Sequence, residues 1–340
     1  MGLGRILFTA VNAVTPILIL ILIGYFLKRR GFLTDGFLKV ANKLVFNLCL
    51  PCTLFMNVYN ISGVAALRWD VIWYSLAMVL LIFVLGLGTA LVATKVPARK
   101  GVILQCTFRS NLAIIGISLA AAIGGEEAQS VTAIITAFSV PFFNVLAVIA
   151  LSIFGEEQKK PEIGKILMKI WKNPLIIGAA LGLAVLGLRE VQSQLLGEVV
   201  FSIQGNLPFL HTAIKQLNSI ATPLALIVLG GQFEFSAVKG MAKEIWVGTL
   251  WRLVVAPVLG IGIAILLSKY TTLLSFGPND YPGLIALFGS PVAVSSAIMA
   301  QQMGSDGQLA TQYVMWTSLG SVVTIFVTVC IMMATGLIVV

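Results

Sequence analysis

Two short groups of residues, each in the middle of an apolar segment, are best suited to chemistry in this sequence. They are Arg109, Ser110 and Asn111 in the first segment and Ser290, Pro291 and Val292 in the second. An arginine supplies a fixed positive charge and an asparagine a neutral amide donor, while a proline removes a backbone hydrogen bond and interrupts a helix. The combination predicts a site that binds an anion such as a carboxylate.

A second motif with chemical potential is the pair Cys49 and Cys52, which has the C-x-x-C spacing of thiol-disulfide enzymes with Pro51 between the cysteines. A redox pair of this kind opens a helix on a soluble scaffold, where its surroundings stabilise the thiolate. Here both thiols fall within an apolar segment, where burial disfavours the thiolate. We therefore interpret Pro51 as a helix break and the two cysteines as small hydrophobic residues.

The composition places these residues in a membrane protein. Of the 340 residues, 59% are hydrophobic and 10% are charged, against about 45–50% and about 25% in soluble domains. The excess apolar surface must face lipid. The net charge of +9 comes from basic residues in a few short loops, which excludes a nucleic-acid partner and indicates the positively charged loops of a membrane protein.

Ten segments are apolar enough to cross a bilayer, which takes about 20 residues. They are 7–27, 38–60, 71–94, 101–123, 129–154, 172–189, 208–232, 244–267, 283–303 and 309–338. The seventh is interrupted near its start by Lys215, Gln216 and Asn218. The sequence thus predicts an all-α polytopic membrane protein with ten transmembrane helices.

The distribution of Lys and Arg predicts the orientation of these helices. Fifteen of these residues fall in the loops after helices 1, 3, 5 and 7, and five fall on the opposite side. Because basic loops stay in the cytoplasm, both termini are expected outside the cytoplasm. The protein is expected to be a multi-pass protein of the cell inner membrane. Arg109 and Arg252 lie inside predicted helices.

The two halves of the chain, on either side of a basic cytoplasmic linker at 156–171, are weakly similar. The aligned pairs are Pro16 with Pro174, Pro51 with Pro223, and Asn111 with Pro291. Five helices per half give the second half the opposite topology, so 1–155 and 172–340 are predicted to form an inverted repeat. Such repeats are typical of secondary transporters, which bind their substrate near the middle of the bilayer.

Helices 4 and 9 are expected to be broken and to cross at their breaks, helix 9 at Pro291 and helix 4 near Asn111, with further helix breaks at Pro51 and Pro223. Broken backbone is tolerated only inside protein or beside a water-filled cavity. A crossing would direct two helix N-termini toward one point, which favours an anion. Each of these residues could instead have a structural role. Pro291 could form a packing kink, and Asn111 an interhelical hydrogen bond. Arg109 could neutralise backbone carbonyls or extend its side chain to the membrane–water interface.

Four segments of the chain resemble the auxin efflux carrier family, which includes bacterial and yeast carriers related to the plant PIN-FORMED auxin exporters. They are LVFNLCLPCTLF from Leu44, FRSNLAIIGISLA from Phe108, ATPLALIVLGGQF from Ala221 and SPVAVSSAIMAQQMGSDGQLAT from Ser290. The resemblance covers nearly the whole chain. It implies a five-plus-five inverted repeat similar to the bile acid symporters and sodium/proton antiporters.

The resemblance also implies how the protein works. Helices 1, 2, 6 and 7 would form a scaffold, and helices 3–5 and 8–10 a transport domain that moves as an elevator. The bacterial members look like carriers of small organic anions such as malate or malonate. In the plant carriers an asparagine at the helix 4 crossing contacts the substrate carboxylate, and Asn111 matches it. The plant carriers have a proline where this chain has Ser110, so auxin itself is not expected as the substrate.

The ionisable residues bear on the driving force. All 13 acidic residues fall in loops or near predicted helix ends, and the single histidine, His211, lies near the outer start of helix 7. This argues against a proton carrier with a central acid, and so against the alternative function, a sodium/proton-type cation exchanger. Sodium remains open, because helix 9 offers Ser295, Ser296, Gln301 and Gln302 as oxygen ligands, and polar residues near this crossing bind sodium in the bile acid symporters. A uniporter is equally open.

The predicted function is therefore secondary active transport of a small carboxylate or dicarboxylate by an elevator-type carrier. Catalysis is not expected, because the chain has one histidine and neither an H-E-x-x-H nor a G-x-S-x-G motif. No cofactor other than sodium is expected. The predicted partners are the organic anion, the lipid bilayer and a second copy of the chain in a homodimer formed through helices 2 and 7.

Overall fold

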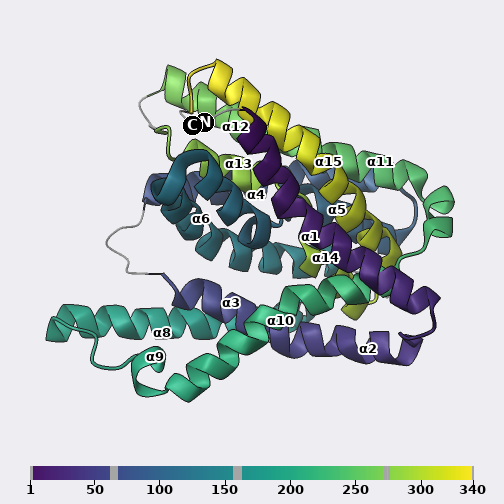
Figure 1. Ribbon diagram of the computed structural model, residues 1–340, viewed down its shortest axis with the longest axis horizontal. Coiled ribbons are helices and arrows are strands. Elements are labelled where there is room, and N and C mark those ends of the chain that lie inside the picture. The colour runs from purple at the N-terminus through teal and green to yellow at the C-terminus, as the bar shows by residue number, and fades with distance from the viewer. Residues whose placement is uncertain (1–2, 62–67, 156–162, 272–273, 275, 339–340) are drawn as a thin grey trace.

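The computed structural model describes residues 3–61, 68–155, 163–271, 274 and 276–338, and every regular element in these ranges is helical (Figure 1). In chain order the elements are α1 (Leu3–Arg29), α2 (Asp35–Leu44), η1 (Val45–Cys49), α3 (Leu50–Tyr59), α4 (Trp69–Ala93), α5 (Pro97–Phe108), η2 (Leu112–Gly116), α6 (Ile117–Ile153), α7 (Ile163–Trp171), α8 (Pro174–Leu196), α9 (Ile203–Asn206), α10 (Pro208–Gln232), η3 (Phe235–Gly240), α11 (Ala242–Leu250), η4 (Trp251–Val255), α12 (Ala256–Tyr270), α13 (Tyr281–Gly289), α14 (Val294–Gln302) and α15 (Gly307–Ala334). The all-α class is confirmed.

Seven helical stretches in the described residues are long and apolar enough to cross a membrane. They are Asp35–Tyr59, Trp69–Ala93, Leu112–Ile153, Pro174–Leu196, Pro208–Gln232, Ala242–Tyr270 and Gly307–Ala334. The predicted spans 7–27 and 283–303 are not among the seven, and Leu112–Ile153 joins the second half of predicted span 101–123 to predicted span 129–154 across a kink at Gly124 and Gly125. The protein therefore has several membrane-spanning helices, while the number ten and the inverted repeat stay predictions.

The two interrupted helices meet at their interruptions. α5 ends at Phe108 and the helix resumes at Leu112, while α13 ends at Gly289 and α14 begins at Val294. The two extended linkers pair as an isolated antiparallel bridge between Ser110 and Val292. The Asn111 N–H donates to the Pro291 carbonyl at 2.7 Å, and the Ala293 N–H donates to the Arg109 carbonyl at 3.2 Å. Each linker thus satisfies backbone groups of the other, as buried non-helical backbone requires.

The predicted helix breaks at Pro51 and Pro223 are wrong. Pro51 lies in the first turn of α3, directly after the π-helical turn η1, and the chain stays helical from Asp35 to Tyr59. The wider π turn accommodates the proline ring and its missing N–H without ending the helix. Pro223 lies inside α10, which continues to Gln232, because the loss of one hydrogen bond leaves the neighbouring turns of a spanning helix intact.

The helices near the site form two groups. α3, α8 and α10 lie together along the lower edge of Figure 1, below α4, α5, α6 and α11–α15. Glycines allow close backbone contact within the lower group and with α1: a side chain at Gly178 would overlap the Pro51 backbone, and one at Gly230 would overlap the Ile21 backbone. Small residues at such contacts are how helices pack tightly in membranes.

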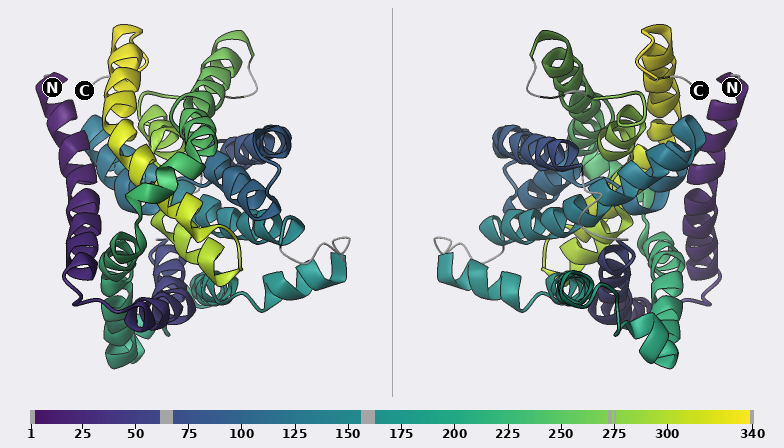
Figure 2. Two further views of the ribbon diagram at one scale, coloured as in Figure 1. Left: turned by 90° about the vertical axis from the view of Figure 1, so that its right-hand side faces the viewer. Right: turned by 90° about the vertical axis from the view of Figure 1, so that its left-hand side faces the viewer.

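The segment between the two halves is partly helical. The predicted linker 156–171 begins with residues 156–162, which lie outside the described residues, and continues as α7. In Figure 2 α7 extends sideways from the bundle, across the direction of α8, which is seen end-on. Residues 163–171 of the predicted linker form a helix because apolar residues recur there at helical spacing between the lysines.

Candidate functional site

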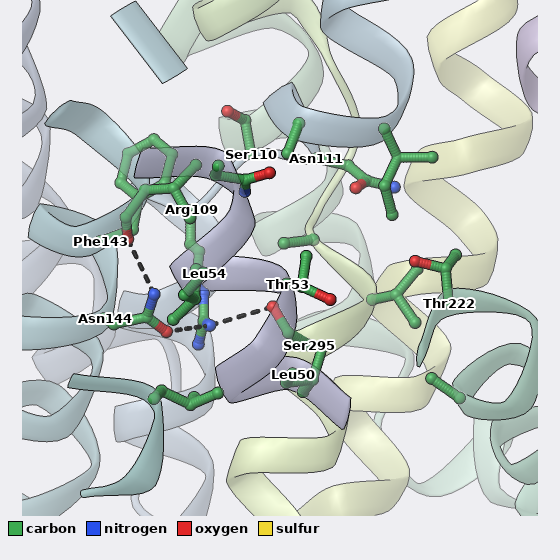
Figure 3. Close-up of a pocket in the computed structure, with 18 residues that line it drawn as sticks. Leu50, Thr53, Leu54, Arg109, Ser110, Asn111, Phe143, Asn144, Thr222 and Ser295 are labelled. Atoms are coloured by element: carbon green, nitrogen blue, oxygen red, sulfur yellow. Dashed lines mark hydrogen bonds between the residues drawn. The ribbon is translucent and has the colours of Figure 1, made fainter. Parts of the chain in front are cut away.

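A cavity lies against the paired linkers, between them and the helices α3, α6, α8 and α10 (Figure 3). Its lining residues are Leu50, Thr53, Leu54 and Asn57 of α3, the linker residues Arg109, Ser110 and Asn111 with Ala113 and Ile114, Val140, Phe143 and Asn144 of α6, Leu175, Thr222 and Ala225, and Ala293, Val294 and Ser295. Water-sized molecules can occupy about 60 Å³ of it, which suits a few waters or a small solute. No acidic residue of the described chain lines it.

Arg109 points into this cavity and is held by neutral groups. Its side chain is buried, with 2% of the residue exposed. The guanidinium donates from Nη2 to Asn144 Oδ1 at 2.6 Å and to Ser295 Oγ at 3.0 Å (Figure 3). From Nη1 it donates to Met299 Sδ at 3.1 Å and, in the amide orientation that satisfies Gln105, to that side chain at 2.7 Å. In the described part of the chain Arg109 forms no ion pair, so its charge is uncompensated.

Three more polar atoms at the cavity have no hydrogen-bond partner. They are the amide nitrogens of Asn111 and Asn57 and the hydroxyl oxygen of Ser110, all of them buried. A buried polar atom without a partner costs about 1–3 kcal/mol. Two of these three atoms are obligate donors, as is the arginine beside them, so the cavity is matched to a ligand that accepts hydrogen bonds and carries negative charge.

At the crossing, the N-terminal ends of two helical segments face the cavity, and the C-terminal ends of the other two face away from it. The two segments that begin there, at Leu112 and Val294, direct their first turns to the cavity. The two that end there, α5 and α13, direct their last carbonyls to a second buried arginine, Arg252. Because helix N-termini are electropositive and C-termini electronegative, the cavity faces the two positive ends.

Arg252 donates hydrogen bonds to the backbone carbonyls at the C-terminal ends of α5 and α13. It donates to the Thr107 carbonyl at 3.3 Å, to the Leu287 carbonyl at 3.1 Å and to the Phe288 carbonyl at 2.5 Å. Arg252 is 1% exposed and does not line the cavity. Neutralisation of backbone carbonyls, one of the alternatives weighed for Arg109, is thus the role of Arg252.

The structure separates the predicted binding residues into two sets. Arg109, Ser110 and Asn111 line the cavity. Ser290, Pro291 and Val292 do not: they form the supporting linker, in which the Pro291 carbonyl accepts from Asn111 and the Val292 N–H donates to Thr317 Oγ1 at 3.0 Å.

The four residues predicted as sodium ligands lie in different surroundings. Ser295 lines the cavity and accepts from Arg109, and Gln301 accepts from the Asn42 amide of α2. The Ser296 hydroxyl is buried without a partner, and Gln302 is the last residue of α14. Ser295 and Gln302 are seven residues apart on one helix, about 10 Å along its axis, so the four do not converge on one ion.

Sequence reasoning missed the residues that come from distant helices. Asn144, Asn57, Thr53 and Thr222 reach the cavity from α6, α3 and α10. The signal available for them is that each is a polar residue within an apolar span, and that Thr53 and Asn57 are four residues apart on one helical face. Nothing in the sequence indicates that these faces turn toward Arg109.

Comparison with known proteins identifies the kind of protein to which this cavity belongs. The sequence pattern of a family described as membrane transport proteins matches residues 9–329, almost the whole chain. The chain belongs to this family. The expected resemblance to the auxin efflux carriers is therefore confirmed, and the cavity at the helix crossing is the candidate solute site of a membrane transport protein.

Two curated members of this family are similar to the chain. One, described as an uncharacterized transporter of Methanothermobacter thermautotrophicus, is 22% identical over 327 residues, which are 92% of this chain and 95% of the relative. Another, an uncharacterized transporter of Methanocaldococcus jannaschii, is 25% identical over 253 residues, 72% of this chain and 76% of the relative. Both relatives are described as transporters, and the first is matched along nearly its full length.

Proposed function

We propose that this membrane transport protein carries a small organic anion, a mono- or dicarboxylate, that binds at the helix crossing. The observation that carries the proposal is the buried, uncompensated guanidinium of Arg109 at a cavity without acids. A buried charge without a partner is costly, and it is retained where a ligand of opposite charge completes the site. The unpaired amides of Asn111 and Asn57 add donors for the carboxylate oxygens.

An elevator mechanism is the second part of the proposal. The cavity lies between the group of α3, α8 and α10 and the paired linkers, which is where a solute would sit between a fixed scaffold and a moving transport domain. The proposed scaffold is predicted helices 1, 2, 6 and 7, and the proposed moving unit is helices 3–5 and 8–10. The proposed arrangement keeps ten crossings in an inverted repeat, both termini outside the cytoplasm and a homodimer in the inner membrane.

A cation exchanger of the same fold is the alternative, and the cavity disfavours it. A cation bound at Ser295 would lie next to the guanidinium that donates to this hydroxyl at 3.0 Å, where like charges repel. Asp280, a buried acid, is paired with Arg68 at 3.2 Å and does not line the cavity. We propose that transport proceeds without sodium and is driven by the gradient of the anion and by the membrane potential.

The direct test is a ligand screen on the purified protein. Small carboxylates and their primary amides, which have nearly the same shape and no charge, are compared for their effect on the unfolding temperature, with uptake into liposomes as the second readout. We expect stabilisation and uptake for one class of carboxylates and neither for the amides. Equal stabilisation by the amides, or stabilisation by amines of the same size, would contradict the proposal.

A further inference from the structure

A stripe of polar residues on α10 leads from the start of this helix to the cavity. His211, Lys215, Asn218 and Thr222 follow one another at i, i+4, i+7 and i+11, which places them on one helical face. Thr222 lines the cavity. Lys215 and Asn218 therefore lie in line with the cavity, one to two turns nearer to the beginning of α10.

The polar face of α10 is accessible, although the helix is among those apolar enough to span a membrane. Lys215 and the adjacent Ser219 are exposed, and Asn218 is half-buried. The opposite face carries exposed apolar residues, Phe209 and Ile220. Polar side chains inside a span face protein or water, because contact with hydrocarbon is costly. The stripe is therefore assigned to water, while the opposite side, which carries Phe209 and Ile220 with one exposed polar residue, Gln216, is the more apolar face of this helix.

Beyond Thr222 the same helical face becomes apolar and closed. Ala225, Leu226 and Leu229 continue the stripe toward the other end of α10, and all three are buried. On that side Gln301 of α14 accepts a hydrogen bond from Asn42 of α2. The cavity is thus sealed toward the end of α10 and approached by polar residues from its beginning.

The two half-helices that begin at the crossing also differ in exposure: the one toward the sealed side is buried, and the one toward the open side is partly exposed. Residues Ser296 to Ala300 of α14 are all buried. The half-helix after Asn111 instead exposes Ile114 and Ser118, four residues apart on one face. This half-helix runs to Gly124, which packs near Pro282 at the start of α13, while α14 runs to the opposite, sealed end.

Two basic side chains, Arg189 and Lys215, lie at the open end, where α8 also carries Glu190. The Arg189 guanidinium lies 5.3 Å from the centre of the Tyr59 ring and donates to the Tyr59 carbonyl at 2.7 Å. The other neighbour of this ring is His211, at 5.7 Å between ring centres, one turn before Lys215. Lys215 forms no ion pair within the described residues. A lysine without an ion pair attracts anions that approach along this face of α10.

We infer that the His211–Lys215–Asn218–Ser219 face of α10 is the water-filled route by which an anion reaches the cavity, and that Lys215 is where the anion is first held. The nature of the solute rests on the proposed function. The access of water to this face does not, so the two can fail separately.

Thiol labelling tests the route. In a background in which Cys49, Cys52, Cys106 and Cys330 are replaced by Ala, Ser219→Cys and Lys215→Cys place a thiol on the stripe, and Ile220→Cys places one on the apolar face. A membrane-impermeant methanethiosulfonate reagent is applied to the protein in liposomes. We expect labelling at 215 and 219 and protection at 220. Protection of all three thiols, with full labelling after unfolding, would overturn the route, as would equal labelling at 220.

A second experiment tests whether the charge of Lys215 attracts the anion. Ser219→Cys should react faster with an anionic than with a cationic reagent, and Lys215→Gln should abolish this preference while Lys215→Arg keeps it. In uptake, Lys215→Gln should raise KM about fivefold at low salt and less at high salt, with the maximal rate unchanged. The control Lys269→Gln removes a lysine at the end of α12 and should leave KM unchanged. A reagent preference that survives Lys215→Gln would overturn the capture role. Labelling of the stripe that no carboxylate slows would leave the route intact and count against the proposed solute.

Discussion

Arg109 and Arg252 are two arginines buried to nearly the same degree, 2% and 1% exposed, on either side of one helix crossing. Arg252 donates to three backbone carbonyls at the ends of α5 and α13, which are strong acceptors at the negative ends of helices. Arg109 has side-chain partners that carry no charge. Burial alone therefore does not reveal what a charge in a membrane does; its partners do.

The difference divides the crossing into a structural face and a binding face. On the Arg252 side both terminal nitrogens of the guanidinium donate to backbone carbonyls, and its Nε has no partner. On the Arg109 side the charge, the unpaired amides and the positive helix ends remain available to a ligand. Substitutions at the two arginines should then have opposite signatures, one on stability and one on transport.

The largest effect is expected for Arg252→Met. This change leaves three buried carbonyls without donors, each at a cost of about 1–3 kcal/mol, so most of the protein should fail to fold or unfold at a much lower temperature. Arg252→Lys should recover part of the loss. Thermal unfolding in detergent measures both variants. An unfolding temperature like that of the wild type for Arg252→Met would remove the distinction between the two faces.

Arg109→Gln should give the reverse pattern. Loss of a charged hydrogen bond to the solute, about 1.5–3 kcal/mol, lowers carboxylate uptake about 10- to 150-fold. The unfolding temperature should stay constant or rise, because a buried uncompensated charge is removed. Uptake into liposomes and thermal unfolding, measured on the same preparation, separate the two effects. A variant that unfolds as easily as Arg252→Met would make Arg109 a structural residue.

Asn111→Ala should lower uptake by about tenfold, because it removes one neutral donor from the site. Asn111→Asp should lower it further by placing a negative charge beside the solute. Asn47→Ala is the matched control, since Asn47 is an exposed asparagine that donates to the Lys43 carbonyl. Equal uptake by the Asn111→Ala variant and the control would remove Asn111 from the binding site.

The smallest effect is expected on replacing sodium with potassium at constant membrane potential. Ser295 accepts from Arg109 and Gln301 from Asn42, which leaves the Ser296 hydroxyl as the one unpaired side-chain oxygen among Ser295, Ser296 and Gln301. Uptake should change less than about twofold. A strict requirement for sodium would show that the ion binds elsewhere and that the solute is not driven by its own gradient alone.

The sequence allowed the helical class and the interruption of helix 9 to be predicted, because apolar runs indicate the spans and Pro291 interrupts one of them. The interruption of helix 4 was predicted from the alignment of Asn111 with Pro291. The proline rule failed at Pro51 and Pro223, where a π turn or one lost hydrogen bond absorbs the ring. The helix α7 within the linker, residues 163–171, was not predicted from the sequence.

The contacts between site residues that are far apart in the chain could not be predicted from the sequence. Arg252 meets carbonyls that lie 145, 35 and 36 positions away along the chain, and Gln301 meets Asn42 at a separation of 259. Spacing along a helix predicts which residues share a face, but not which face of another helix packs against it. For this reason Arg109 and Asn111 were found and Asn144 and Asn57 were not.

The most direct test is the substitution Asn144→Asp. It keeps the shape of the side chain and places a carboxylate where the amide oxygen now accepts from Arg109 at 2.6 Å. If Arg109 is the receptor for the anion, this internal carboxylate should abolish stabilisation by carboxylates and their uptake, while the protein still folds, because the ion pair with Arg109 offsets the loss of the hydrogen bond from the Asn144 amide to the Val140 carbonyl at 2.8 Å. Undiminished binding of carboxylates by Asn144→Asp would contradict the account.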